Sequence, residues 1–129
     1  VHSGGCINHI SSHIALHAMR EGLLETHIDH LRRTYRGRLE TMDESLHQHF
    51  DGIAEWTRPG GGYFFWLRVD ESIDTTPLKQ AALEKQAGFT AGSLFSGDGG
   101  LHNHLRLSFA HYDEDDIRVG IARLRTLFE

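Results

Sequence analysis

The sequence predicts an α/β (α+β) domain: a small, mostly antiparallel sheet of three to four strands with helices on one face, preceded by a long helix. Three observations predict this fold. Apolar residues recur every three to four positions through most of residues 7–50, which is the helical period. Residues 62–69 are instead rich in aromatic and β-favouring side chains, and residues 105–110 alternate strictly, which is the period of a strand. Helical spacing returns after Asp113, and such a succession of strands and helices is typical of layered domains.

Two helices are expected in the first 50 residues. The first is predicted from about residue 6 to Glu21, where Gly22 ends it. The second is predicted from Thr26, a cap residue with Asp29 three positions later, to Phe50. Its apolar stripe consists of Leu24, Ile28, Leu31, Tyr35, Leu39, Met42, Leu46 and Phe50.

A β-hairpin is expected next. The turn-forming residues 58–61 separate a short segment, residues 53–57, from the aromatic run at 62–69. Thr76-Pro77 then predicts the cap and the start of a helix that reaches about Ala87, because proline is favoured in a first helical turn.

The last part of the chain is predicted to hold two strands and a helix. Residues 88–91 form a short strand before the glycine-rich loop 97–100, and residues 105–110 form the second strand. Asp113 caps the final helix, and acidic residues crowd its first turn. The buried stripe of that helix consists of Ile117, Ile121, Leu124 and Phe128.

Length and composition exclude several classes of protein. The chain has 129 residues, which suits one domain, and its 18 acidic against 13 basic residues give a net charge of −5. That balance argues against nucleic-acid binding, which needs a basic face. Cys6 is the only cysteine, so no intramolecular disulfide forms and a cytoplasmic location is expected. The longest uncharged apolar run, residues 63–67, is too short to cross a membrane. Because the sequence starts at Val1 without a signal peptide, we expect an excised or processed piece.

Arg106 is the most informative polar residue. Leu105, Leu107 and Phe109 share one face of the predicted strand, so Arg106 points to the other face. An arginine fixed on a strand is suited to holding a carboxylate by two parallel hydrogen bonds. On the pattern alone, a solvated or ion-paired arginine is the more common outcome.

Other candidate sites are weaker. His9, His13 and His17 share a helical face. The zinc-protease motif needs a Glu directly after the first His of a pair, and Ile14 follows His13 instead, so we expect no metal. We treat His102 and His104 as solvated or capping residues. Gly60-Gly61-Gly62 leads into a strand, whereas a phosphate loop leads into a helix. Neither Cys6 nor Ser108 has a neighbouring base that would make it a nucleophile.

Five stretches of the chain together resemble a known family. They are Leu31-Arg32-Arg33-Thr34-Tyr35-Arg36-Gly37-Arg38, Pro59-Gly60-Gly61-Gly62-Tyr63-Phe64-Phe65-Trp66-Leu67, Thr90-Ala91-Gly92-Ser93-Leu94-Phe95-Ser96, Leu105-Arg106-Leu107-Ser108-Phe109-Ala110 and Asp113-Glu114-Asp115-Asp116-Ile117. In this order they resemble the C-terminal small domain of class I/II, fold type I, pyridoxal-phosphate-dependent aminotransferases. The 2-aminoadipate and aromatic aminotransferase branch is the most similar. The resemblance covers nearly the whole chain.

The resemblance implies a role for Arg106. In that family the arginine of the Leu-Arg-Leu-Ser-Phe strand binds the α-carboxylate of the substrate, and this role falls on Arg106. Tyr63, in the aromatic stretch, is a second candidate substrate-binding residue. Pyridoxal 5'-phosphate is implied in the full-length enzyme but is not expected on this chain alone, because Lys79 and Lys85 lie on a predicted surface helix. We therefore assign no catalytic, cofactor-binding or metal-binding residue, and expect the chain alone to be inactive.

The resemblance also implies partners. Residues 1–129 would be the small domain, with residues 1–25 joining it to a large domain that binds the cofactor. A homodimer with amino acid and 2-oxo acid substrates is expected, without nucleic-acid or membrane partners. Two alternatives stay open: an aminotransferase-like domain of a winged-helix transcriptional regulator, or a stand-alone structural or interaction domain. The stand-alone domain predicts polar exposed faces, whereas a small domain would expose an apolar patch.

Overall fold

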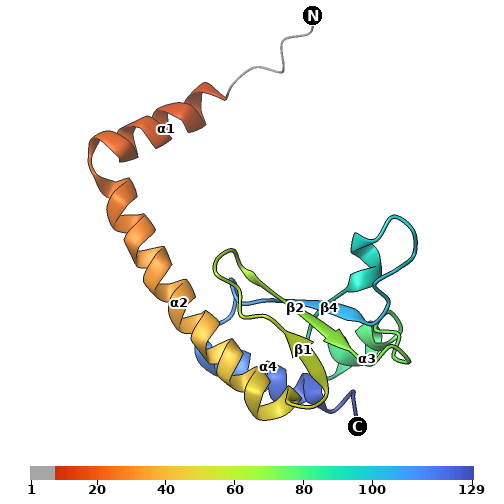
Figure 1. Ribbon diagram of the computed structural model, residues 1–129. Helices are drawn as coiled ribbons and strands as arrows, with labels where there is room; N and C mark the ends of the chain where they lie inside the picture. Colours follow the sequence, from red (N-terminus) through yellow and green to blue (C-terminus); the bar gives the residue numbers. More distant parts are fainter. Residues whose placement is uncertain (1–7) are drawn as a thin grey trace, which may run out of the picture. The chain divides into compact units, whose positions relative to one another are not determined.

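The computed structural model describes residues 8–129, coloured along the chain in Figure 1. These residues divide into two units, one ending at Thr34 and the other running from Tyr35 to Glu129. Helix α2 (Leu23–Phe50) contributes residues to both units. The expected helix start at residue 6, Cys6 and the first seven residues of the predicted joining segment lie outside the described residues.

The first unit contains helix α1 (His9–Arg20) and the beginning of α2. Asn8 caps α1, because its side chain accepts a hydrogen bond from the Ser11 backbone N–H at 3.1 Å. Gly22 has a φ of 68°, a left-handed conformation that glycine adopts at little cost, and α2 begins at the next residue. The prediction that Thr26 opens this helix is therefore wrong by three residues. The Thr26 hydroxyl instead donates to the Gly22 carbonyl, within the first turn.

The second unit is built on one four-stranded sheet. Its strands are β1 (Ala54–Trp56), β2 (Phe64–Val69), β3 (Thr90–Ala91) and β4 (His104–Ser108), in the order β1-β2-β4-β3. All three neighbouring pairs are antiparallel, which confirms the predicted sheet and hairpin. Helix α3 (Leu78–Glu84) and the short 3-10 helix η1 (Gly92–Phe95) stand on either side of β3 in the sequence, and α4 (Glu114–Arg125) ends the fold.

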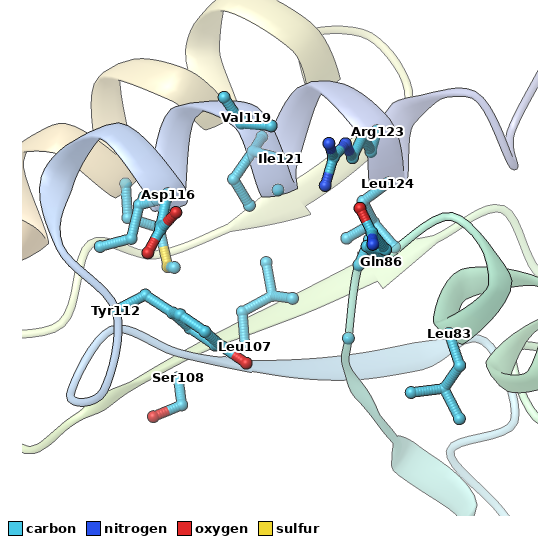
Figure 2. Close-up of a pocket in the computed structure, with 15 residues that line it drawn as sticks. Leu83, Gln86, Leu107, Ser108, Tyr112, Asp116, Val119, Ile121, Arg123 and Leu124 are labelled. Carbon is cyan, nitrogen blue, oxygen red and sulfur yellow. The ribbon is translucent and has the colours of Figure 1, made fainter.

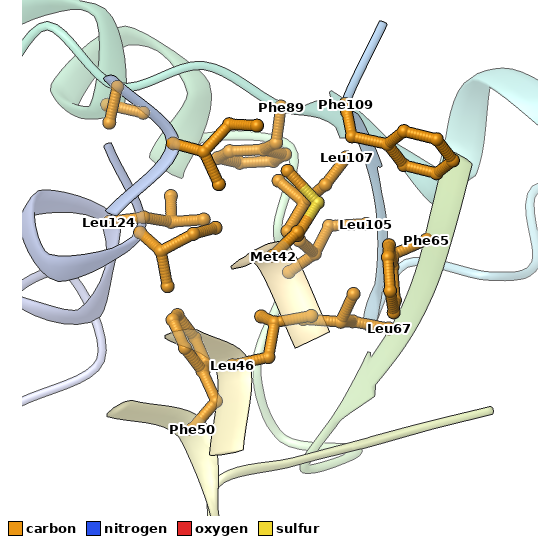
Figure 3. Close-up of a cluster of buried hydrophobic side chains, with 14 of the residues drawn as sticks. Met42, Leu46, Phe50, Phe65, Leu67, Phe89, Leu105, Leu107, Phe109 and Leu124 are labelled. Atoms are coloured by element: carbon orange, nitrogen blue, oxygen red, sulfur yellow. The ribbon is translucent and has the colours of Figure 1, made fainter. Parts of the chain in front are cut away.

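One hydrophobic core joins the sheet to α2 and α4 (Figure 3). Alternate residues of the two central strands, Phe65 and Leu67 on β2 and Leu105 and Leu107 on β4, are at most 3% exposed. They face a helical layer made of Met42, Leu46, Phe50, Ile117, Ile121 and Leu124. Burying each such side chain contributes about 1.5–3 kcal/mol. The core therefore fixes which face of the sheet stays free of the helices α2 and α4.

The ends of helices α3 and α4 agree in part with the predicted helix boundaries and caps. Asp113 caps α4 as predicted, since its carboxylate accepts from the Asp116 N–H at 2.9 Å. The Thr76-Pro77 start of α3 is placed correctly, but the Thr76 hydroxyl does not cap the helix. It contacts the Ser93 hydroxyl at 2.9 Å instead. Helix α3 ends at Glu84, three residues before the predicted Ala87, and the chain then turns through Gln86 with a φ of 55°.

Candidate functional site

Arg106 lies on the face of the sheet opposite the core. Its neighbours Leu105 and Leu107 are 0% and 3% exposed, and the pleat directs Arg106 to the other side, where it is half-buried. It is paired with Trp66 on β2 and with Thr90 on β3. The placement predicted from the alternation of β4 is confirmed.

Two aromatic rings contact the Arg106 guanidinium. Its Cζ atom lies 4.0 Å from the ring centroid of Phe64 and 4.5 Å from that of Phe95, both within cation–π distance. Phe64 comes from β2, whereas Phe95 comes from η1, which directly follows β3. Because β2 and β3 flank β4, the rings reach Arg106 from elements on both sides of its strand.

Arg106 has no acidic partner within residues 8–129. Neither a salt bridge nor a hydrogen bond joins its guanidinium to any side chain of that range. Arg68, on the same face of the sheet, is paired with Glu55 at 2.5 Å. The two rings that contact Arg106 are also partly open: Phe64 and Phe95 are 42% and 45% exposed. An unpaired cation in an exposed apolar setting is suited to an anionic ligand.

Gly92 brings η1 close to β4. A Cβ atom at Gly92 would lie 2.4 Å from the Leu101 carbonyl oxygen and 2.6 Å from the Cβ of His104. Only glycine leaves room for this approach, which places Phe95 beside Arg106. Phe95 also packs edge-on against Trp66, with ring centroids 5.4 Å apart.

Tyr63 is not brought to Arg106 by any contact in the described part of the chain. Its ring packs edge-on against Tyr35 at 5.1 Å and is 48% exposed. Its substrate-binding role stays a prediction. The contacts with Phe64 and Phe95 were missed by sequence reasoning. The alternation of β2 could have found Phe64, because Phe65 is buried and Phe64 therefore shares the face of Arg106.

His104 lies two residues before Arg106 on the same face. Its ring is 5.7 Å from that of Trp66, and its buried Nδ1 has no hydrogen-bond partner in residues 8–129. Burial lowers the pKa of His104, and the positive charge of Arg68 adds to this effect. The lowered pKa favours the neutral imidazole at pH 7, so His104 adds no competing positive charge beside Arg106.

Metal-binding clusters are absent from the described residues. No group of three or more His, Cys, Asp or Glu side chains in residues 8–129 could hold a metal ion, and this includes the face of His9, His13 and His17. In the same range, no helix combines the length and the apolar composition needed to cross a membrane.

Gly62 has a φ of 79° in the turn before β2, as expected for a turn residue.

The described residues do not fit pyridoxal phosphate on their own. Its aldehyde needs a lysine and its phosphate needs clustered donors. Lys79 and Lys85 are both exposed, one on α3 and one at its end. In the glycine-rich loop, the Gly100 N–H donates to the Ser96 hydroxyl and to the Asp98 carboxylate, and the Ser96 hydroxyl donates to Asp98. These polar groups are therefore paired with one another within the loop.

A separate pocket of about 410 Å³ lies between α4, β4 and the end of α3 (Figure 2). Leu107, Ile117 and Ile121 are among its apolar lining residues, and Tyr112 and Val119 are exposed at its edge. Arg106 and the two rings that contact it are not among the lining residues. This pocket is therefore distinct from the candidate site.

Relatives in sequence include enzymes and regulators. No model of a known protein family matches the sequence. The chain is 33% identical to aromatic-amino-acid aminotransferase 1 of Thermococcus litoralis, over 92% of this chain and 28% of that protein. It is 31% identical to an uncharacterized aminotransferase of Saccharolobus solfataricus, over 89% of this chain and 29% of that protein. It is also 30% identical to the uncharacterized HTH-type transcriptional regulator YdfD of Bacillus subtilis, over 89% and 23% of the two chains.

Solved structures agree with these sequence relatives. The α-aminoadipate aminotransferase LysN of Thermus thermophilus, complexed with N-(5'-phosphopyridoxyl)-L-leucine, superposes with a TM-score of 0.80 at 30% identity. The match covers 88% of this chain and 29% of LysN. An archaeal alanine:glyoxylate aminotransferase gives a TM-score of 0.83 at 28% identity, over 92% of this chain and 30% of that one.

The chain thus spans under a third of the length of the proteins it matches. The sequence similarities and the superpositions on solved aminotransferases agree on one type of domain. The chain is a class I aminotransferase fold-type domain, homologous to the C-terminal part of these enzymes and similar to the 2-aminoadipate, aromatic and multiple-substrate aminotransferases.

Proposed function

We propose that this chain is the substrate-carboxylate-binding small domain of a pyridoxal-phosphate-dependent amino acid aminotransferase. One observation carries the proposal: Arg106 is a half-buried cation on the open sheet face, without an acidic partner in residues 8–129. A planar guanidinium in this state binds a carboxylate by two parallel hydrogen bonds. Amino acids and 2-oxo acids both carry their α-carboxylate on the carbon that loses or gains the amino group. One arginine can therefore orient both substrates of a transamination.

The exposed surface supports a covering partner. Phe64 and Phe95 leave apolar area open beside Arg106, and Leu94, the residue before Phe95, is exposed as well, as expected for a face that another protein surface covers. In this proposal residues 1–129 are the small domain, residues 1–25 join it to a large domain, and the large domain holds the cofactor. The enzyme acts as a homodimer in the cytoplasm. Tyr63, at the start of β2, is a second residue proposed to contact the substrate.

Arg106→Ala in the complete enzyme tests the proposal. Losing one partner of a desolvated charge pair costs about 2–5 kcal/mol, so kcat/KM for the amino donor should fall at least about thirtyfold, with the cofactor still bound. Arg106→Lys should have a kcat/KM between those of Arg106→Ala and the parent, because lysine supplies the positive charge without the planar guanidinium. Arg33→Ala is a matched control, since Arg33 is an exposed arginine of α2. Kinetic constants within twofold of the parent would refute the role of Arg106.

The 129-residue chain alone should show neither transaminase turnover nor the absorbance of a lysine–pyridoxal Schiff base. Both of its lysines are exposed, and neither contacts Arg106 or the two rings beside it. A stoichiometric Schiff base on this chain would contradict the proposal that a large domain supplies the reactive lysine.

A second candidate function follows from the similarity to the Bacillus subtilis regulator. The same domain in a transcriptional regulator would bind a carboxylate ligand at Arg106 and transmit binding without turnover. The complete polypeptide discriminates the two functions: an enzyme turns over an amino acid and a 2-oxo acid, whereas a regulator shows DNA binding that changes with ligand. The exposed Phe64 and Phe95 disfavour a stand-alone structural domain, which would present polar faces.

A further inference from the structure

We propose that Phe64 and Phe95 form a clamp that fixes the Arg106 guanidinium for carboxylate binding. Neither residue is assigned this role by the proposed function. The inference rests on that function, because it concerns how the carboxylate-binding cation is held. Phe64 and Phe95 are positioning residues here: they act through Arg106.

The backbone fixes both rings relative to Arg106. Phe64 is opposite Ser108 in the β2–β4 register, and Arg106 is opposite Trp66, so Phe64 and Arg106 are diagonal neighbours on one face. Diagonal neighbours in antiparallel strands are within reach of aromatic and long side chains. This register accounts for the distance of 4.0 Å between the Arg106 Cζ and the Phe64 ring centroid.

Phe95 is held by two independent contacts. Gly92 lets η1 approach β4 more closely than any other residue would, and the Trp66 ring packs against Phe95 edge-on. The Phe95 ring centroid then lies 4.5 Å from the Arg106 Cζ. The two rings therefore come from different elements, β2 and η1, and Arg106 contacts both.

Aromatic rings can hold an arginine without neutralising it. A carboxylate partner fixes a guanidinium by occupying its N–H groups, as Glu55 does with Arg68 at 2.5 Å. A ring face attracts the cation through its quadrupole and leaves the charge in place for a ligand. An arginine that is already ordered also loses less side-chain freedom on binding. The clamp thus combines order with an available positive charge.

Nuclear magnetic resonance of the 129-residue chain, labelled with ¹⁵N at arginine, tests the clamp. The spectrum of Arg106→Ala identifies the Arg106 Nε–H signal. Without ligand, ring currents should shift this signal in the parent, and Phe64→Leu and Phe95→Leu should each reduce the shift. Tyr112→Leu is the matched control, because Tyr112 is an exposed aromatic residue that does not contact Arg106.

Sodium acetate is the probe for carboxylate binding, replacing sodium chloride at constant ionic strength. We expect a saturable change of the Arg106 signal in the parent, and acetate affinity about two- to fivefold weaker in each leucine variant. Phe64→Trp and Phe95→Trp should bind acetate more tightly than the corresponding leucine variants, since tryptophan is the strongest cation–π partner. Tyr112→Leu should bind acetate as the parent does.

The outcomes separate the clamp from the proposed function. If the parent binds acetate through Arg106 and both leucine variants bind it equally well, the clamp is wrong and the role of Arg106 stands. If the parent binds acetate no better than Arg106→Ala, the carboxylate role fails, and the clamp fails with it. An Arg106 signal that is unshifted in the parent would also overturn the clamp.

Discussion

Gly92→Ala should destabilise the second unit strongly. Gly92 is buried, and an added Cβ would lie 2.4 Å from the Leu101 carbonyl oxygen and 2.9 Å from that of His104. Both atoms belong to the backbone around the start of β4, so neither can rotate away. Overpacking typically costs 1–3 kcal/mol, and backbone contacts this short favour a value of about 3 kcal/mol. That is a large share of the 5–15 kcal/mol of a typical domain.

Urea unfolding measures this effect. With a slope of about 1.5 kcal/mol per molar urea, a loss of 3 kcal/mol lowers the midpoint by about 2 M. Gly60→Ala is the matched control, because no atom lies within 4 Å of its added Cβ and its φ is not left-handed. Its midpoint should stay within about 0.3 M of the parent. A Gly92→Ala midpoint equal to that of Gly60→Ala would refute the packing argument.

Three further predictions concern other polar groups. Thr75 is fully buried and its hydroxyl contacts two backbone carbonyl oxygens at 2.8 and 3.0 Å, so Thr75→Val should lower the unfolding free energy by about 1–3 kcal/mol, whereas exposed Thr76→Val should not. Asp113→Ala should cost about 1 kcal/mol and reduce helicity by circular dichroism, because it removes the α4 cap; Asp113→Asn should cost less. The folded-state pKa of His104 is lowered, so its contribution to stability is present above the unfolded pKa of about 6.5 and is lost as the pH falls toward the folded pKa. His104→Gln should therefore flatten the decline of the urea midpoint below pH 6.5. A decline as steep in His104→Gln as in the parent would contradict this assignment.

The sequence predicts those features that depend on local periodicity. The alternation of Leu105, Leu107 and Phe109 places Arg106 on the opposite face because side chains of a strand alternate by rule. The buried stripe Ile117, Ile121 and Leu124 of α4 and its Asp113 cap are predicted for the same reason, since spacing and cap chemistry act within a few residues. The fourth predicted member, Phe128, lies beyond the end of α4 at Arg125 and is only partly buried. The face of the sheet that carries Arg106 therefore follows from the spacing of apolar residues alone.

Features that depend on contacts between distant residues could not be predicted. Phe95 follows a short strand in a segment without periodicity, and its place beside Arg106 depends on the close approach of Gly92 to residues 101 and 104. The Thr76 hydroxyl bonds to Ser93, 17 residues away, which no capping pattern shows. The start of α2 depends on the left-handed backbone of Gly22, where the cap chemistry of Thr26 suggested another boundary.

Gly92 links the stability of the second unit to the proposed carboxylate site. The close contact of Gly92 with β4 stabilises the sheet edge, and the same contact sets the position of Phe95 beside Arg106. Phe64 is positioned differently, by the β2–β4 register, which core residues such as Leu67 and Leu105 maintain. A change at Gly92 should therefore alter stability and the Arg106 environment together. A change of the exposed Phe64 ring should alter the Arg106 environment while the core, which lies on the other face, keeps its packing.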